Sequence, residues 1–260
     1  MTADRATTLL CDADGSLFPS EEPAFVASVV VTNDFMAAFG RDLRFEPEQL
    51  RLSTTGKNFR ATIVDLAVQH GIPIEPGLTK RLGRPASTGS GRTLSEADLE
   101  AWVITERQAV SKYLGEVLTP DPEVITAITA LAERYRLCVV SSSALIRLDA
   151  CFRATGLDRL FPAELRFSAE DSLAVPTSKP DPAVYRHAGL RLGVAGRQGI
   201  AIEDSRPGAL SAIAAGFPTL GNVCFVPEAE RPERVRVLRE AGADTVLDSW
   251  PALADRLLNG

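Results

Sequence analysis

Short apolar runs alternate with helical patterns along much of the chain. The runs TTLLCD at 7–12, RLCVVSSS at 136–143 and GIAIEDS at 199–205 are each followed by a turn and then by a segment with helical periodicity. PTLGNV at 218–223 and TVLDS at 245–249 have the composition of two further strands. Short strands that alternate with helices are typical of a parallel sheet covered on both faces. The pattern therefore predicts an α/β protein with a parallel sheet.

Three of the predicted strands end in polar residues. Asp12 and Asp14 follow the first strand, serines occupy 141–143 at the end of the second, and Glu203 and Asp204 end the third. In open parallel sheets, ligands bind beyond the carboxyl ends of the strands. We therefore expect a ligand site where these polar residues meet.

The region between the first two of these strands has a different pattern. NFRATIVDLAVQHG at 58–71 and SEADLEAWVITERQAVSKYLG at 95–115 have helical periodicity, and no comparable strand lies between them. We therefore expect a helical domain over 20–115, inserted into a core domain formed by 1–19 and 116–260. The segment at 26–33 has strand propensity, but its helical surroundings favour a helix. The link at 84–93 is rich in Gly and Ser and is predicted to be a mobile loop.

Composition and charge narrow the choice of partners. The net charge of −6 argues against nucleic acid or an anionic membrane as the main partner. The four cysteines have no paired spacing, so no zinc site or disulfide framework is indicated, and Cys11 and Cys138 are expected to be small buried side chains. No signal peptide and no apolar run long enough to span a bilayer are seen, which predicts a cytoplasmic location. The sequence does not indicate an oligomeric state.

The stretch DADGS at 12–16 has several explanations when taken alone. Aspartate and glycine after a strand form ordinary turns. A calcium loop is excluded because its glycine position is Leu17 and its closing glutamate position is Pro23. A sugar-nucleotide transferase would need a nucleotide-binding region before its Asp-x-Asp pair, and only about ten residues precede Asp12.

The other polar segments are also ambiguous individually. Asp204 or Ser205 would serve as a helix N-cap, which explains one of the acids at 203–204 and not both. Lys179 in SKPDPAVY would be solvated in most proteins, and the serines at 141–143 would suit the cap of a helix that starts near Ala144.

Together, these motifs resemble the haloacid dehalogenase superfamily of phosphohydrolases. The matching segments are TLLCDADGSL at 8–17, CVVSSS at 138–143, SKPDP at 178–182 and IEDSRPGALSAIAAG at 202–216, with finer matches in SE at 20–21 and in the segment that leads into the second motif. The resemblance implies a Rossmann-like core with an inserted helical cap, as in the sugar phosphatases and β-phosphoglucomutases of the superfamily.

The chemistry of phosphate esters agrees with these residue types. A carboxylate that approaches a phosphate dianion meets a repulsion of about 4 kcal/mol per charge pair at ~4 Å and an effective dielectric near 20. A Mg²⁺ ion between them removes this repulsion, and it prefers oxygen ligands. Asp12, Asp204 and Glu203 are the candidate side-chain ligands, and the resemblance adds the backbone carbonyl of Asp14.

The remaining polar residues would act on the phosphoryl group. Lys179 and Ser141 are expected to stabilise its oxygens in the transition state, and Ser142 is a further candidate for substrate binding. The family resemblance implies that Asp12 is the nucleophile, which forms an aspartyl-phosphate, and that Asp14 is the general acid and base. Dehalogenases and phosphonate-cleaving members lack this second acid, so Asp14 favours phosphate ester chemistry.

The segment STTGKNFRATI at 53–63 corresponds to the loop of the cap that faces the substrate. Lys57 and Arg60 are the candidate substrate-binding residues there, and two solvated residues at a helix start are an equally good alternative. A Walker phosphate loop is excluded because TGKN lacks the required glycine spacing and the Ser or Thr after lysine.

The sequence thus predicts a Mg²⁺-dependent phosphatase that acts on a small phosphorylated metabolite, a sugar or polyol phosphate. One alternative is a sugar phosphomutase of the β-phosphoglucomutase type, although Ala24 stands where those enzymes typically have a histidine. The other is a non-catalytic binding protein with the same fold, although such proteins usually lose the nucleophile or the metal carboxylates.

Overall fold

The computed structural model of the protein describes residues 7–54, 58–81 and 91–260. These residues divide into two compact units. The core unit lies within residues 1–21 and 114–260, and the cap unit covers residues 22–113. The cap unit is therefore an insertion into the chain of the core unit.

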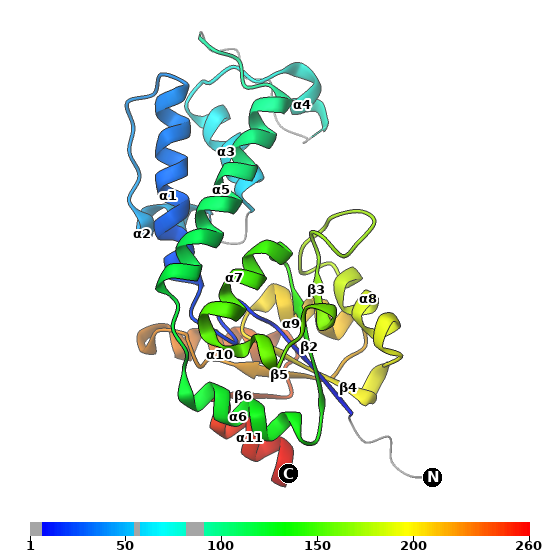
Figure 1. Cartoon of the computed structure of the whole chain (residues 1–260). Helices are drawn as coiled ribbons and strands as arrows, with labels where there is room; N and C mark the ends of the chain where they lie inside the picture. Colours follow the sequence, from blue (N-terminus) through cyan, green and yellow to red (C-terminus); the bar gives the residue numbers. More distant parts are fainter. Residues whose placement is uncertain (1–6, 55–57, 82–90) are drawn as a thin grey trace. The chain divides into compact units, whose positions relative to one another are not determined.

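The core unit is built on a six-stranded parallel sheet (Figure 1). The strands are β1 (Thr8–Cys11), β2 (Arg136–Ser141), β3 (Arg166–Ser168), β4 (Gly199–Glu203), β5 (Thr219–Asn222) and β6 (Thr245–Leu247). Their order across the sheet is β3-β2-β1-β4-β5-β6, and every neighbouring pair is parallel. The predicted α/β fold with a Rossmann-like parallel sheet is confirmed. Strand β3 was not predicted, because its three residues are too few to form a visible apolar run.

Strand β1 lies in the middle of the sheet, between β2 and β4. All of its residues are buried, as expected for a parallel strand with helices on both faces. Its last residue is paired in register with Val139 of β2 and Ile202 of β4. The next residues along the three strands, Asp12, Val140 and Glu203, therefore lie at one level across the sheet.

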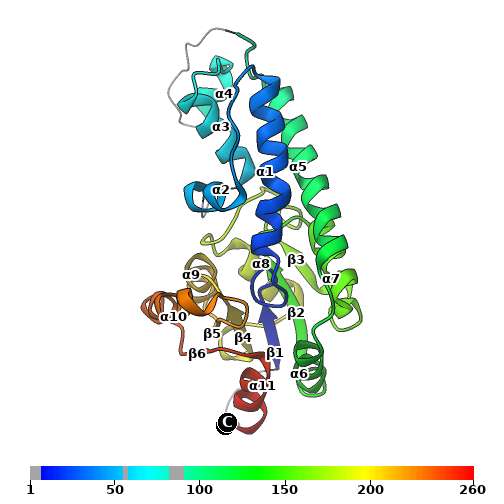
Figure 2. The ribbon, with the colours of Figure 1, turned by 90° about the vertical axis from the view of Figure 1, so that its left-hand side faces the viewer.

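The helices of the core unit cover the two faces of this sheet. They are α6 (Pro122–Ala132), α7 (Leu145–Thr155), α8 (Ala183–Leu192), α9 (Arg206–Ala214), α10 (Arg231–Glu240) and α11 (Trp250–Asn259), with short 3-10 turns η1 (Leu157–Arg159), η2 (Ala163–Leu165), η3 (Gly196–Gln198) and η4 (Glu228–Glu230). Helix α8 packs on β2 and β3, α9 on β4 and β5, and α10 on β5 and β6, while α6 and α11 pack on each other. Because crossovers between parallel strands are right-handed, α8 to α10 cover the face opposite α6 and α7 (Figure 2).

A dense apolar core lies between the sheet and helices α8 and α9. Its buried residues include Leu10, Cys138, Val140, Val184, Tyr185, Ala201, Ala212 and Phe217. Burying each large apolar side chain contributes about 1.5–3 kcal/mol, so this packing fixes the strands from which the polar residues project. Cys11 and Cys138 are both buried, as predicted.

The cap unit is helical. Its helices are α1 (Glu21–Ala38), α2 (Pro47–Thr54), α3 (Phe59–Gln69), α4 (Pro76–Arg81) and α5 (Glu96–Val117), of which α1 starts and α5 ends in the core unit. Helix α1 lies beside α5 (Figure 2), and the rings of Phe35 and Trp102 meet there with centroids 5.8 Å apart. Helix α1 covers residues 26–33, so the predicted helix there is confirmed, and packing overrides local strand propensity. Most of the loop predicted at 84–93 lies outside the described residues.

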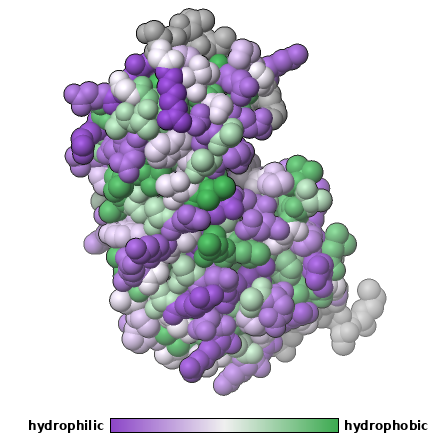
Figure 3. Space-filling view, turned by 45° about the horizontal axis from the view of Figure 1, so that its top comes forward, coloured by the Kyte–Doolittle hydropathy of each residue, from purple (hydrophilic) through white to green (hydrophobic). Residues whose placement is uncertain are grey.

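Polar side chains are spread over the face drawn in Figure 3, with apolar residues in small groups between them. Exposed large apolar residues come from both units, and Val175 and Leu190 of the core unit are the most exposed. Within the described ranges, no helix is both long and apolar enough to cross a membrane.

Candidate active site

Lys179 joins three strands of the sheet near their carboxyl ends. Its ammonium group donates hydrogen bonds to the Asp12 carboxylate, to the Val140 carbonyl oxygen at 2.8 Å and to Glu203 Oε1 at 2.6 Å. These partners lie at one level across β1, β2 and β4, so a single cation reaches all of them. Burial alone would lower the pKa of Lys179, but the two carboxylates raise it above its ordinary value. Lys179 is therefore held in its charged form.

Three carboxylates gather beside this ammonium group. Asp12, Glu203 and Asp204 each offer an oxygen within 4.8 Å of the others, and all three residues are buried. Burial raises the pKa of Asp12 to about 8 against the opposing effect of Lys179, and Glu203 adds to the rise. Burial, Asp12 and other nearby carboxylates also raise the pKa of Asp204. The single charge of Lys179 therefore does not balance the three carboxylates.

The chemistry of this cluster is compatible with a divalent metal ion. Among the described residues, the buried Oε2 of Glu203 has no hydrogen-bond partner, although buried polar atoms are normally paired. Carboxylate oxygens are the ligands that Mg²⁺ takes in proteins. A cation here would also offset the burial and repulsion that raise the pKa values of Asp12 and Asp204. Asp12, Glu203 and Asp204 therefore fit the expected magnesium ion.

Two glycines allow the backbone to approach these carboxylates closely. Gly15 has a φ of +76°, and a Cβ at this position would lie 2.5 Å from Oδ2 of Asp204. A Cβ at Gly208, in the first turn of α9, would overlap the Glu203 carboxylate. Glycine is the residue that permits both the positive φ and the close approach.

Replacing Gly208 by alanine is expected to reduce activity. In a helix, alanine is favoured over glycine by about 1 kcal/mol, but the added methyl group must displace the Glu203 carboxylate from Lys179. Because Glu203 is fully buried, it has little space to move, and we expect kcat/KM for a phosphate ester to fall about tenfold or more. Phosphate release measures the effect.

The matched control for this variant is Gly115→Ala. Gly115 also lies in a helix, and a Cβ there would meet only the Ala150 Cβ, at 3.6 Å, which is an ordinary contact. This control should keep full activity. Equal rates for Gly208→Ala and Gly115→Ala would contradict the expected displacement.

The carboxylate of Asp14 is held by a separate set of donors. Oδ1 accepts hydrogen bonds from Ser20 Oγ at 2.5 Å and from Arg147 Nη2 at 2.8 Å. Oδ2 accepts hydrogen bonds from Ser143 Oγ at 2.6 Å and from Ser141 Oγ at 3.4 Å. Burial raises the pKa of Asp14, but Arg147 and the serine hydroxyls outweigh it and hold the pKa below its ordinary value. The side chain is therefore ionised and lies outside the group of three clustered carboxylates.

The serines after β2 bind the neighbouring loops. Ser141 Oγ accepts a hydrogen bond from the backbone N–H of Ser143 at 3.0 Å, and Ser142 Oγ accepts one from the backbone N–H of Lys179 at 3.0 Å. The alternative in which these serines cap the next helix is wrong, because the first N–H of α7 is bound by Asp171 Oδ2 at 2.6 Å. The serine side chains therefore contact residues of the candidate site and do not cap α7.

The two acids at the end of β4 are not needed to cap a helix. Ser205 is the N-cap of α9, and its Oγ accepts a hydrogen bond from the Gly208 N–H at 3.2 Å. Arg234 Nη1 donates to the carbonyl oxygen of Asp204 at 3.0 Å and holds that residue from α10. The carboxylates of Glu203 and Asp204 are thus both left for the cluster.

Two residues from the far end of the chain hold the loop that carries Asp12 and Asp14. The carbonyl oxygen of Ser16 accepts hydrogen bonds from Asn222 Nδ2 at 3.1 Å and from Trp250 Nε1 at 2.7 Å. Asn222, Trp250 and Ser16 are all fully buried. This contact fixes the turn after β1 against β5 and α11.

Of the two predicted substrate-binding residues of the cap unit, the structure describes only Arg60. Lys57 lies outside the described residues. Arg60, in the first turn of α3, forms a two-pronged ion pair with Glu100 of α5, with N–O distances of 2.5 and 2.7 Å. The structure therefore places Arg60 in a contact within the cap unit, and its substrate-binding role stays a prediction.

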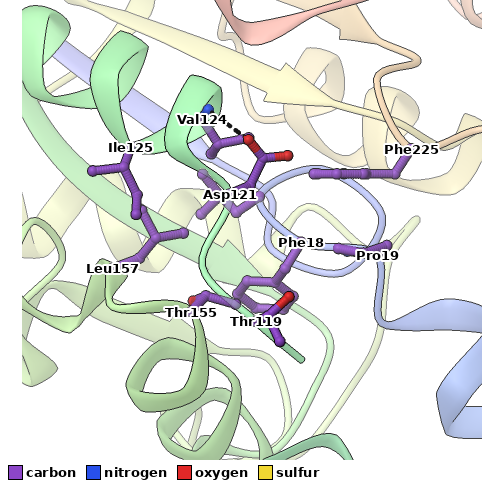
Figure 4. A pocket seen from close by; sticks show the side chains of 10 residues that line it. Phe18, Pro19, Thr119, Asp121, Val124, Ile125, Thr155, Leu157 and Phe225 are labelled. Carbon is purple, nitrogen blue, oxygen red and sulfur yellow. Dashed lines mark hydrogen bonds between the residues drawn. The ribbon is translucent and has the colours of Figure 1, made fainter. Parts of the chain in front are cut away.

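A pocket of the core unit lies beside the loop after β1 (Figure 4). Phe18, Pro19 and Phe225 line it, together with residues of α6 and the preceding segment. Its one ionisable side chain, Asp121, is occupied as the N-cap of α6 and accepts a hydrogen bond from the Val124 N–H, drawn as the dashed line. The residues that line this pocket include no cation, whereas Lys179 supplies one at the carboxylate cluster. The carboxylate cluster is therefore the candidate active site.

A family model for haloacid dehalogenase-like hydrolases matches residues 6–216. The chain belongs to the haloacid dehalogenase-like hydrolase family. The resemblance predicted from the four motifs is therefore confirmed. The protein is therefore a hydrolase of this family, which agrees with the enzyme class that the sequence analysis predicts.

Relatives within the family match over nearly the whole chain. Protein CbbY of Cereibacter sphaeroides is 31% identical over 253 residues, which cover 94% of this chain and 93% of the relative. A solved structure of a mutant of CbbY from Rhodobacter sphaeroides, in complex with xylulose-1,5-bisphosphate, has a TM-score of 0.65 and 23% identity, covering 94% of this chain and 95% of that one. The solved structure of a predicted phosphoglycolate phosphatase from Haemophilus somnus has a TM-score of 0.65 and 17% identity. The match covers 100% of this chain and 99% of that one. These structures share the fold of the haloacid dehalogenase-like hydrolases.

The structure adds side chains that the sequence analysis did not select. Tyr185 donates from its hydroxyl group to Glu203 Oε1 at 2.5 Å, and burial and Glu203 raise the pKa of Tyr185. Ser20 and Arg147 bind Asp14, and Arg234 binds Asp204. Ser20 belongs to a segment that matches the family motifs, and Tyr185 lies three residues after the matching segment SKPDP, so a signal was present for Ser20 and close by for Tyr185. Arg147 and Arg234 lie in ordinary helical segments, and only the tertiary structure brings them to the site.

Proposed function

We propose that this protein is a Mg²⁺-dependent phosphatase that hydrolyses a sugar or polyol phosphate through an aspartyl-phosphate on Asp12. The observation that carries the proposal is the convergence of Asp12, Glu203 and Asp204 beside the ammonium group of Lys179. Phosphoryl transfer depends mainly on positioning and on electrostatic stabilisation of the phosphoryl oxygens. A buried lysine among carboxylates that suit a metal ion supplies both the positioning and the electrostatic stabilisation.

Asp12, Glu203 and Asp204 would hold the metal ion, together with the backbone carbonyl of Asp14 that the family resemblance implies. When bound, Mg²⁺ supplies positive charge beside the transferring phosphoryl group. Lys179 adds a fixed positive charge from the chain itself, and its three hydrogen bonds keep it in place. Ser141 and Ser142 offer hydroxyl groups for the phosphoryl oxygens.

The first chemical step transfers the phosphoryl group to the protein. A carboxylate oxygen of Asp12 attacks phosphorus, a new O–P bond forms and the bond from phosphorus to the ester oxygen breaks. Asp14 donates a proton to the departing oxygen, which leaves as an alcohol. Because Asp14 is ionised in this structure, it must take up a proton before this step.

The second step regenerates the enzyme. Asp14, now ionised, accepts a proton from a water molecule that attacks the phosphorus of the aspartyl-phosphate. The bond between phosphorus and the Asp12 oxygen breaks, and inorganic phosphate is released. The hydroxyl groups of Ser20 and Ser143, which bind the ionised form of Asp14, favour this half of the reaction.

A sugar or polyol phosphate is the substrate class that the comparisons support best. The structure of the CbbY mutant contains a sugar bisphosphate, and that fold covers nearly all of this chain.

The proposal is tested by measuring phosphate release from a panel of sugar, polyol, nucleotide and short-acid phosphates. With Mg²⁺ we expect release from at least one sugar or polyol phosphate, and with EDTA we expect the rate to fall to background. Release that continues unchanged in EDTA would contradict the metal dependence. Isomerisation of a sugar phosphate without net phosphate release would support the mutase alternative instead.

A further inference from the structure

We infer that Arg147 is a positioning residue that fixes the Asp14 carboxylate for proton transfer to the leaving oxygen of the substrate. The inference rests on the proposed function, because it requires Asp14 to serve as the general acid. Arg147 would then affect the reaction only through Asp14, without contact with the reacting atoms.

The first argument is the geometry of the ion pair. Arg147 Nη2 lies 2.8 Å from Asp14 Oδ1, and their side chains are only 24% and 17% exposed. Exposed ion pairs contribute little because water screens them and both side chains are mobile. This pair is partly shielded, and a charged hydrogen bond is about twice as strong as a neutral one. It therefore restrains the carboxylate more than the serine hydroxyls do alone.

The second argument is the distribution of donors around Asp14. Ser143 and Ser141 bind Oδ2, whereas Ser20 and Arg147 bind Oδ1. Without the arginine, Oδ1 keeps only the neutral hydroxyl group of Ser20 as a donor. A proton is transferred efficiently only over a short, aligned hydrogen bond, so a loosely held carboxylate loses rate.

The third argument is the place of Arg147 in its helix. It stands in the first turn of α7, where the positive end of the helix dipole disfavours a cation. Arg153 occupies the last turn of the same helix, where the dipole favours a cation. Helix stability thus explains Arg153 and does not explain Arg147. The Asp14 contact offsets the unfavourable position.

The helix itself is arranged to hold the arginine in place. The N-cap residue of α7 makes no side-chain hydrogen bond, and Asp171 from the loop after β3 binds the N–H of Leu145 at 2.6 Å. An anion at this end also offsets the dipole. The first turn that carries Arg147 is therefore fixed from outside the helix.

Two esters of similar size but different leaving groups test the inference. Benzyl phosphate releases an alkoxide that needs a proton, whereas 4-nitrophenyl phosphate releases a stable phenolate that does not. For Arg147→Gln, we expect kcat/KM with benzyl phosphate to fall about 10- to 100-fold, which is part of the factor of about 10²–10⁴ that general acid catalysis contributes. The lost alignment of the carboxylate outweighs the easier protonation of Asp14 that removal of the cation brings. With 4-nitrophenyl phosphate, kcat/KM should stay within about twofold of the wild type. Arg147→Lys should recover part of the loss, because it keeps the charge without the planar guanidinium group.

Two further variants separate positioning from a general structural effect. Arg153→Gln removes an arginine from the same helix, away from Asp14, and should leave both esters unaffected. In the Asp14→Asn background, Arg147→Gln should cause no further loss with benzyl phosphate, because residues that act as a unit are not additive.

The outcomes distinguish this inference from the proposed function. An equal loss with both esters, or a full additional loss in the Asp14→Asn background, would overturn the role of Arg147 and leave the phosphatase intact. If the wild-type protein released phosphate from neither ester nor from the wider panel, both the proposed function and the role of Arg147 would be wrong.

Discussion

Asparagine in place of Asp12 is expected to abolish phosphate release and to leave the fold intact. The asparagine side chain has nearly the same shape, but its amide cannot form the aspartyl-phosphate. Loss of a catalytic nucleophile lowers kcat by about 10⁴–10⁶-fold in enzymes of comparable design. The change also removes one of three clustered carboxylates, so no new like-charge repulsion is introduced.

Two measurements check this expectation. Phosphate release in Mg²⁺ gives the rate, and acid quenching with phosphate-labelled substrate shows whether label stays on the protein. We expect trapped label in the wild type and none in Asp12→Asn. Asp158→Asn, at an exposed position of the core unit, is the matched control and should keep full activity. A rate for Asp12→Asn within tenfold of that control would rule out Asp12 as the nucleophile.

Methionine in place of Lys179 is expected to abolish activity and also to destabilise the protein. Lys179 is the ammonium partner of both Asp12 and Glu203, which are buried. Removing one member of a buried ion pair costs about 3–5 kcal/mol, because the remaining charge is left without a partner. The lost positive charge at the phosphoryl group lowers kcat by about a hundredfold or more.

The loss of stability should depend on pH. In the metal-free protein, the pKa of Asp12 is raised from 3.8 to about 8 by burial, although Lys179 lowers it. Between these values the folded protein binds more protons than the unfolded chain, so stability falls as the pH rises through this window. Without Lys179 the pKa of Asp12 rises further, and the destabilisation should be larger at pH 8 than at pH 5.

Urea unfolding in EDTA at pH 5 and at pH 8 measures this difference. Lys80→Met, at an exposed position of the cap unit, serves as the control for loss of a lysine and should be as stable as the wild type. An equal loss of stability for Lys179→Met at both pH values would show that unpaired carboxylates are not its cause.

The main elements of the fold were predictable because the sheet is buried on both faces. Strands such as β1 and β2 appear in the sequence as short apolar runs, and each ends abruptly in polar residues. Strand β3 was missed because Phe167 is its only large apolar residue. The helix over 26–33 was predicted from its surroundings against local propensity, and the packing of α1 in the cap unit explains why that succeeded.

The candidate site was predictable only as far as its residues lie within motifs. Asp12, Lys179, Glu203 and Asp204 stand at fixed places beside turns, and the register of the strands brings them together. Arg147 was not predictable, because its contact with Asp14 joins residues 133 positions apart through the packing of α7.

The sequence also could not show that Asp14 is held ionised. That state depends on donors from two separate segments, at Ser20 and at 141–147, and none of them belongs to the turn that carries Asp14. The turn chemistry of DADGS is local, whereas the protonation of its second acid is set by tertiary structure.

Because β1 lies between β2 and β4, the newly synthesised chain carries it with at least one unpaired edge for most of translation. The second neighbour, β4, begins at Gly199, whereas β1 ends at Cys11. At roughly 5–20 residues per second, this interval lasts about 10–40 s. During that time an apolar strand with a free edge can pair wrongly with other chains. The nascent chain also carries Asp12 without Lys179, Glu203 and Asp204, so the candidate site is complete only when the last third of the chain has been made.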